Sequence, residues 1–108
     1  DKKIKTIVKP ALETLEEFIS DNLIFDIIFI DADKNNYKNY YDKVIQMTKQ
    51  GGLIIIDNVL WHGEVADEEN NEKFTNIIRD FNTYVKNDKR TEQVILPLGD
   101  GLTICRKL

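Results

Sequence analysis

Two stretches of the sequence decide the fold: Phe25-Asp26-Ile27-Ile28-Phe29-Ile30-Asp31 and Leu53-Ile54-Ile55-Ile56-Asp57-Asn58. Each is a short, almost uninterrupted apolar run, which is typical of a strand buried on both faces of a parallel sheet. Each run ends at an acidic residue. A segment with helical spacing separates them, so the pair predicts two parallel strands joined by a helix.

The rest of the chain supplies the neighbouring elements. Apolar residues at helical spacing predict helices over Ala11 to Ser20, Asn36 to Lys49 and Asn71 to Lys86. Strand-like patterns lie at Ile4 to Val8, Gln93 to Leu98 and Leu102 to Lys107. We expect Gly51 and Gly52 to end the second helix. The turn Gly99-Asp100-Gly101 predicts that the last two strands form a hairpin.

These elements predict an open α/β sheet that is mostly parallel, with helices on both faces. The C-terminal hairpin adds one antiparallel strand at the edge. No internal repeat or low-complexity tract divides the sequence, so residues 1–108 are expected to form a single domain. In such sheets ligands bind beyond the carboxyl ends of the strands, because loops and helix N-termini converge there. Asp31 and Asp57 both lie at that edge.

The composition disfavours several classes of function. The 108 residues carry 15 Lys and Arg against 19 Asp and Glu, a net charge of −4, so no positive field favours nonspecific binding to nucleic acid or anionic membranes. The longest apolar runs are far too short to span a bilayer. Cys105 is the single cysteine and cannot form an internal disulfide, which favours a reducing compartment. We therefore expect a soluble, cytoplasmic domain without a membrane partner.

Oxygen-bearing side chains gather after the two strands. Asp31, Asp33, Asp57 and Asn58 offer three carboxylates and one amide oxygen, a set suited to Mg²⁺, Mn²⁺ or Ca²⁺ rather than zinc. The alternative is that each aspartate only caps the following helix. Two acidic strand ends, one of them followed by asparagine, favour the metal site. Lys34 is close enough in sequence to act as a base on a metal-bound hydroxyl, although most lysines are solvated surface residues.

Two ring-bearing residues follow Asn58 in the same predicted loop. Trp61 has two interpretations, as a wall of a substrate pocket or as an apolar anchor that holds the loop to the core. His62 is the only histidine, so a histidine-rich zinc site is excluded. On a loop, such a histidine is more often a surface residue than a catalyst.

Two other motifs involve the same residues. As a calcium-binding loop, the segment from Asp31 has Asn36 at the sixth place, which needs glycine, and a strand rather than a helix precedes it. The Asp-x-Asp pattern after an apolar strand also resembles the haloacid dehalogenase phosphatases. That family has Thr or Val where Asn35 stands and Ser or Thr where Asp57 stands. Both interpretations are therefore disfavoured.

Three ordered motifs together resemble one known family. They are Phe25 to Lys34, Gly51 to Gly63 and Leu96 to Thr103, and they extend over nearly the whole chain. They resemble the cation-dependent O-methyltransferases typified by caffeoyl-CoA O-methyltransferase. The more distant catechol O-methyltransferase shares the acidic strand end, the lysine three residues later and the Asp-Asn pair. Within the α/β class, the resemblance implies a partial Rossmann-like methyltransferase sheet.

The resemblance implies a divalent cation held by Asp31, Asp57 and Asn58, with Mg²⁺ favoured and Mn²⁺ or Ca²⁺ as alternatives. It implies that Lys34 is the general base, and it counts Asp31 with Lys34 among the catalytic residues. Chelation by the cation would acidify a catechol-like hydroxyl and hold it in line with the donor methyl group.

S-adenosylmethionine is the methyl donor of this family. The resemblance implies that Ala11, Asp31 and Asp33 contact the donor. It places His62 near the acceptor substrate, and Asp31 and Trp61 are the other candidate acceptor contacts. His62 departs from the plant pattern, in which an asparagine usually occupies the position, and this departure favours bacterial-type relatives with other acceptors as the comparison.

The family's Gly-rich turn after the first strand and its acidic end of the second strand have no counterpart in the sequence. We therefore expect residues 1–108 to be the C-terminal half of a class I methyltransferase domain, inactive alone, from a homodimeric enzyme. The expected acceptor is a small catechol-like or CoA-linked hydroxyl compound, with a modified tRNA base as an open alternative. The alternative from a different class is a noncatalytic α/β binding or assembly module whose acidic strand ends are structural.

Overall fold

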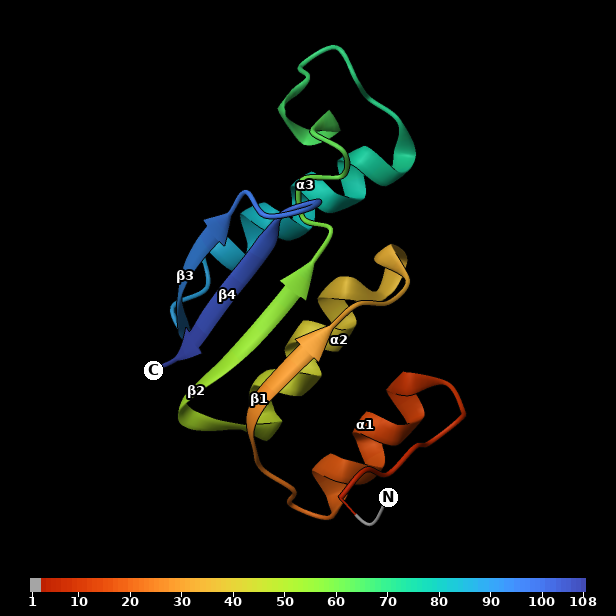
Figure 1. The fold of residues 1–108 in the computed structure, drawn as a ribbon, viewed down its shortest axis with the longest axis vertical. Coiled ribbons are helices and arrows are strands. Elements are labelled where there is room, and N and C mark those ends of the chain that lie inside the picture. The colour runs from red at the N-terminus through yellow and green to blue at the C-terminus, as the bar shows by residue number, and fades with distance from the viewer. Residues whose placement is uncertain (1–2) are drawn as a thin grey trace.

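A computed structural model describes residues 3–108 of the chain (Figure 1). Its α-helices and strands are, in chain order, α1 (Ala11–Ser20), β1 (Phe25–Ile30), α2 (Tyr37–Val44), β2 (Thr48–Asp57), α3 (Lys73–Lys86), β3 (Thr91–Leu96) and β4 (Leu102–Lys107). Short 3₁₀ helices lie at η1 (Lys34–Asn36), η2 (Ile45–Met47) and η3 (Glu64–Ala66). The α/β class is confirmed. None of the helices among residues 3–108 has the length and apolar character needed to cross a membrane.

The strands form a sheet in the order β1-β2-β4-β3. β1 and β2 are parallel, while β4 is antiparallel to both β2 and β3. The sheet is therefore mixed, with one parallel and two antiparallel strand pairs rather than mostly parallel pairing, and the C-terminal antiparallel hairpin is confirmed. The antiparallel strand β4 lies inside the sheet rather than at the edge, where we expected it. Thr103 and Cys105 of β4 are buried, whereas β3 buries only Thr91, so the better-covered strand takes the inner place.

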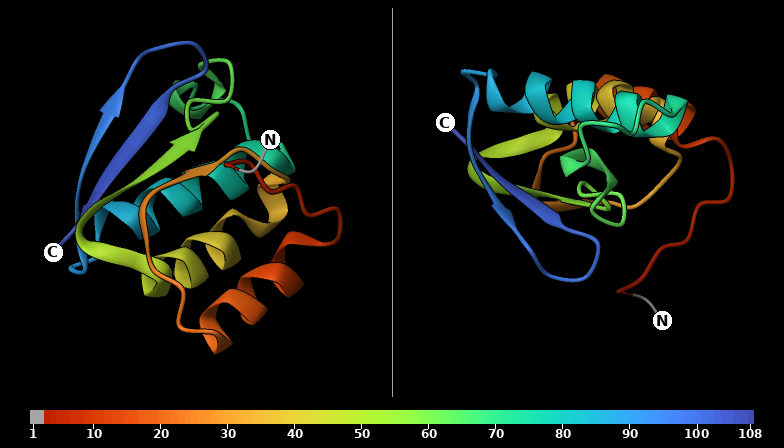
Figure 2. Two further views of the ribbon diagram at one scale, coloured as in Figure 1. Left: turned by 60° about the horizontal axis from the view of Figure 1, so that its bottom comes forward. Right: turned by 90° about the horizontal axis from the view of Figure 1, so that it is seen from above.

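The helices α1, α2 and α3 lie together on one face of the sheet, as the two views in Figure 2 show. We expected helices on both faces, and the described residues do not have that arrangement. Ile28 and Ile30 of β1 pack with the core under the helices, whereas Ile27 and Phe29 are 61% and 56% exposed. The continuous apolar run of β1 predicts that other elements pack on both faces of the strand. Within residues 3–108, helices pack on one face only (Figure 2).

The core lies between the sheet and the helices. Fully or almost fully buried apolar side chains of β2 and α2 form its centre, namely Ile54, Ile56, Tyr37, Tyr41 and Val44. Phe81 of α3 packs edge-on against Tyr37 and Tyr41, with ring centroids 5.4 and 6.1 Å away. This packing holds the start of α2 against α3 and so positions the residues that follow β1.

The second helix is shorter than we expected. α2 ends at Val44, and after η2 the chain is already extended at Thr48. The glycines expected to end the helix lie within β2 instead. Gly51 has a φ of +80°, and a Cβ on Gly52 would lie 2.7 Å from the carbonyl oxygen of Asp26. The glycine pair therefore lets β2 bulge and approach β1 closely. The spacing of apolar residues along one segment does not predict such a contact between two strands.

Other boundaries differ by less. α3 begins at Lys73, two residues late, β3 begins and ends two residues early, and β4 matches its predicted range. The strand-like pattern from Ile4 to Val8 is not a strand in the structure, and Val8 is 93% exposed. Within residues 3–108 this segment pairs with no strand of the sheet.

Candidate functional site

The carboxyl ends of β1 and β2 lie side by side. Ile30 pairs with Ile56 in the parallel register, so Asp31 and Asp57 continue two neighbouring strands at the same level. Asp57 is the last residue of β2, and Asn58 follows it with a left-handed φ of +63°. The tertiary structure thus brings the two predicted acidic strand ends to one edge.

Lys34 joins these two strand ends. Its ammonium group donates to the carbonyl oxygen of Ala32 (3.0 Å), to Oη of Tyr37 (2.6 Å) and to Oδ1 of Asn58 (2.9 Å). Nζ also lies 3.9 Å from Oδ1 of Asp31, and the Lys34 side chain is only 12% exposed. Three N–H donors meet three acceptors, so the group is fully satisfied. Lys34, the predicted base, is therefore also a largely buried structural link.

Tyr37 completes the contacts around Lys34. Its hydroxyl accepts from Lys34 and donates to the carbonyl oxygen of Asp57 (2.9 Å). Burial raises the pKa of Tyr37 to about 12, so the hydroxyl keeps its proton at neutral pH. Tyr37 falls in the helix predicted over Asn36 to Lys49, and we expected no site role for it. Its position three residues after Lys34 is the one signal of a role at this site.

The side-chain amide of Asn58 lies between groups of opposite charge. Oδ1 accepts from Lys34, and Nδ2 donates to Oδ2 of Asp100 (3.0 Å). The backbone N–H of Asn58 donates to Oδ1 of Asp57 (2.7 Å). Both ends of the amide and the backbone therefore have partners, and the oxygen is directed toward Lys34.

Asp100 is a site residue that sequence analysis missed. It lies in the turn between β3 and β4, and its carboxylate, whose side chain is 14% exposed, also accepts from the backbone N–H of His62. Its carbonyl oxygen accepts from the N–H of Leu60 (3.0 Å). The sequence signal is an aspartate between Gly99 and Gly101, which predicts a hairpin but not what the turn contacts.

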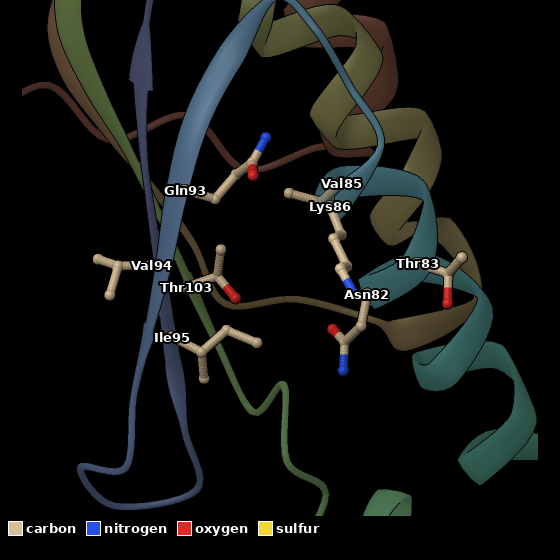
Figure 3. A pocket seen from close by; sticks show the side chains of 8 residues that line it. All are labelled: Asn82, Thr83, Val85, Lys86, Gln93, Val94, Ile95 and Thr103. Carbon is tan, nitrogen blue, oxygen red and sulfur yellow. The ribbon is translucent and has the colours of Figure 1, made fainter.

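A second contact holds the same loop from α3. Nδ2 of Asn82 donates to the carbonyl oxygen of Val59 (2.8 Å), and Oδ1 of Asn82 is buried without a hydrogen-bond partner among the described residues. Figure 3 shows Asn82 at a pocket of about 230 Å³, which Gln93 and Ile95 of β3 also line. None of the predicted site residues lines this pocket.

Trp61 and His62 both have left-handed backbone conformations, with φ of +52° and +58°. The ring of Trp61 packs against Phe74 of α3 with centroids 6.3 Å apart and is partly buried against the core. This contact supports the interpretation of Trp61 as an anchor of the loop. The imidazole of His62 is 76% exposed, with Nδ1 3.8 Å from Oδ1 of Asp100. A substrate contact of either ring stays a prediction.

Two of the three predicted donor-binding residues line one cavity, and the third, Asp33, contacts a residue of that cavity through a hydrogen bond. Ala11 and Asp31 line a cavity of about 250 Å³ between α1, β1 and α2, together with Tyr40. Asp33 does not line it; its carboxylate accepts from the hydroxyl of Tyr40 and from Nδ2 of Asn36 (2.5 Å). These hydrogen bonds lower the pKa of Asp33, that from Tyr40 most. Asp33 therefore has a structural role at the start of α2.

The predicted metal ligands are brought together only in part. Asp57 and Asn58 adjoin, and Asp31 lies at the end of the neighbouring strand. Within the described range 3–108, no group of three or more His, Cys, Asp or Glu side chains is placed to hold a metal ion. The donor chemistry suits a hard cation, because the strand ends offer two carboxylates and one amide oxygen. A metal site stays a prediction.

Comparison with known proteins shows what this chain is similar to. A profile of a protein family described as O-methyltransferase matches residues 1–108. Caffeoyl-CoA O-methyltransferase 1 of Eucalyptus globulus is 43% identical over 107 residues, which cover 92% of this chain and 44% of the relative. Caffeoyl-CoA O-methyltransferase of Medicago sativa is 42% identical over 117 residues, which cover 100% of this chain and 47% of the relative. The chain thus spans about half the length of the curated relatives it matches.

A solved structure shows the same likeness in three dimensions. The crystal structure of the O-methyltransferase from Bacillus cereus in complex with SAH matches with a TM-score of 0.77 and 31% sequence identity. The match covers 92% of this chain and 48% of that chain. The similarity in fold therefore extends over nearly all of this chain.

Proposed function

We propose, from the premise that this chain belongs to the O-methyltransferase family, that it forms part of an enzyme that transfers a methyl group from S-adenosylmethionine to a hydroxyl of a small acceptor. The family match and the SAH complex of the Bacillus cereus neighbour support the donor. One observation carries the proposal: Nζ of Lys34 lies 2.9 Å from Oδ1 of Asn58 and 3.9 Å from Asp31, at two adjoining strand ends. Because the chain spans about half of its relatives, the proposal concerns the whole protein.

The proposed metal site consists of Asp31, Asp57 and Asn58. Its all-oxygen donor set favours Mg²⁺, with Mn²⁺ or Ca²⁺ as alternatives. A cation bound there would lower the pKa of an acceptor hydroxyl and hold that oxygen in line with the donor methyl group. The direction of the Asn58 amide supports the assignment, since an oxygen and not an N–H group is turned toward the strand-end cluster.

Lys34 is the proposed general base, and Asp31 beside it is the second proposed catalytic residue. In the structure Nζ of Lys34 donates hydrogen bonds to three oxygen atoms. Lys34 must release one proton before it can accept another from an acceptor hydroxyl. Contacts from Ala32, Tyr37 and Asn58 hold Nζ in place for that transfer.

Donor and acceptor are proposed to lie on either side of this cluster. Ala11, Asp31 and Asp33 are the proposed donor contacts, and the cavity lined by Ala11 and Asp31 supports them. The acceptor is proposed to be catechol-like or CoA-linked, a class that the caffeoyl-CoA O-methyltransferase relatives support. Trp61, His62 and Asp31 are its proposed contacts, and the exposure of the His62 imidazole supports this role.

Three wider proposals rest on the resemblance and on composition. Residues 1–108 are proposed to be the C-terminal half of a class I methyltransferase domain, which the half-length coverage of the relatives supports. A homodimer follows from the resemblance. A cytoplasmic location follows from the single cysteine, and the net charge of −4 gives no support to a tRNA acceptor.

The first test is a methyl-transfer assay of the full-length protein with labelled S-adenosylmethionine and a catechol acceptor, in Mg²⁺ and in EDTA. We expect transfer that requires Mg²⁺. Asp57→Ala should abolish this transfer while circular dichroism shows a retained fold. Asp88→Asn serves as the control, because Asp88 lies outside the site and pairs with Arg90 and Tyr41.

Two results would contradict the proposal. Transfer by Asp57→Ala at the wild-type rate would remove Asp57 from the metal site. A full-length protein that neither binds Mg²⁺ nor transfers methyl groups would favour the noncatalytic module, with acidic strand ends that are only structural.

A further inference from the structure

The turn between β3 and β4 docks on the loop after β2. Asp57 pairs with Leu102 at the end of the β2-β4 ladder, so the residues before Leu102 adjoin those after Asp57. Backbone hydrogen bonds from Val59 to Gly101 (3.3 Å) and from Leu60 to Asp100 (3.0 Å) continue this contact beyond the strands. Asp100 is therefore held against the loop by its backbone as well as by its side chain.

The side chain of Asp100 is itself fully engaged. Oδ2 accepts from Nδ2 of Asn58 at 3.0 Å, and Oδ1 accepts from the backbone N–H of His62. The side chain is 14% exposed, so water has little access to replace these contacts. Each carboxylate oxygen thus has its own N–H donor from the loop.

We propose that Asp100 is a positioning residue that orients the side-chain amide of Asn58, so that Oδ1 is presented to Lys34 and the strand-end cluster. A carboxylate can only accept hydrogen bonds and an ammonium group can only donate them. With Asp100 on one side and Lys34 on the other, only one orientation of the amide satisfies both neighbours. The reverse orientation would set oxygen against oxygen at Asp100 and N–H against N–H at Lys34.

This inference rests on the proposed function for its chemical purpose. A cation can take an amide oxygen as a ligand but not an amide nitrogen, so the orientation decides whether Asn58 can serve. Asp100 lies behind Asn58 as seen from Lys34 and would act on the cation only through Asn58. Residues in such supporting places commonly change metal affinity by about 10- to 100-fold when they are replaced.

The test uses full-length protein with Asp100→Asn, Asn58→Asp and the double variant that exchanges the two side-chain types. Asp100→Asn leaves one acceptor for two N–H donors, and Asn58→Asp places two carboxylates face to face. The exchange restores every pairing, because an amide at position 100 can accept from His62 and donate to a carboxylate at position 58. Asp88→Asn is the matched control for a largely buried carboxylate elsewhere.

The first readout is the pair of side-chain N–H resonances of Asn58 in a ¹⁵N-labelled, metal-free protein. We expect Asp100→Asn to move them toward the values of a solvated amide and Asp88→Asn to leave them unchanged. The melting temperature should fall in both single variants at the site and recover in the exchange. Unchanged Asn58 resonances in a folded Asp100→Asn protein, or an exchange that melts no higher than either single variant, overturns the inference.

The second readout separates this inference from the proposed function. In the transfer assay, Asp100→Asn should raise the Mg²⁺ concentration for half-maximal rate by about tenfold or more. Asp88→Asn should leave that concentration unchanged. If wild-type transfer does not depend on Mg²⁺, the metal assignment fails, while the Asn58 resonances still decide whether Asp100 orients the amide.

Discussion

The ammonium nitrogen of Lys34 lies 2.9 Å from Oδ1 of Asn58, a contact between residues 24 positions apart in the sequence. It joins the segment after β1 to the first residue after β2. Tyr37 strengthens the same link, since its hydroxyl accepts from Lys34 and donates to the carbonyl oxygen of Asp57. The two strand ends therefore form one connected hydrogen-bonded unit, and disturbing any member should affect both.

Replacing Lys34 tests the proposed base. Lys34→Met keeps the apolar stem and removes the donor, and we expect kcat of the full-length enzyme to fall by about 100-fold or more. Lys38→Met is the control, because Nζ of Lys38 lies over the ring of Tyr84, 4.5 Å from its centroid. Steady-state kinetics beside a urea unfolding curve separates lost chemistry from lost stability. A folded Lys34→Met enzyme within about threefold of the wild-type kcat would contradict the role.

Tyr37 should make the protein less stable at high pH. Burial raises its pKa from 10.0 to about 12, so the unfolded chain loses this proton before the folded chain does. The contribution of the protonated Tyr37 hydroxyl to the free energy of unfolding is complete below pH 10 and is lost as the pH rises from 10 to 12. Urea unfolding of the full-length protein at a series of pH values measures the fall. Tyr37→Phe should show a shallower pH dependence than wild type, and equal slopes would contradict the assignment.

Gly101 should tolerate a side chain less well than Gly99. Both have positive φ, +86° and +54°, so alanine at either position should cost about 1 kcal/mol of unfolding free energy. A Cβ on Gly101 would also lie 2.5 Å from Cγ of Leu60, whereas nothing lies within 4 Å of one on Gly99. We expect Gly101→Ala to cost about 1–3 kcal/mol more than Gly99→Ala in urea unfolding. Similar losses in the two variants would show that Leu60 moves aside easily.

A chain of residues 1–108 should bind S-adenosylmethionine weakly. The cavity with Ala11 and Asp31 is bounded by α1, β1 and α2, and Ile27 and Phe29 on the other face of β1 are more than half exposed. Isothermal titration calorimetry should detect no micromolar binding to this chain, with the full-length protein as the positive control. Micromolar affinity of the chain itself would show that these residues suffice for the donor.

Local pattern accounts for much of the fold. Apolar runs ending at Asp31 and Asp57 predict two parallel strands, and a helical crossover requires that both carboxyl ends reach one edge. The strands and their pairing confirm this arrangement. The prediction that Gly51 and Gly52 end a helix was wrong, because a neighbouring strand decides the conformation there. Gly52 lies in β2, against the carbonyl oxygen of Asp26, and spacing within one segment contains no information about that contact.

The sequence by itself determined the residue types at the strand ends, because apolar runs and the residues that end them are local properties. Only the tertiary structure decided that Asp100 is the partner of Asn58, 42 positions earlier in the chain. The order β1-β2-β4-β3 places β4 next to β2, and the pairing of Asp57 with Leu102 brings the preceding turn onto the loop. Such a hydrogen bond depends on the order of the strands in the sheet. That order is decided by how the whole sheet is buried, which is not a local property of the sequence.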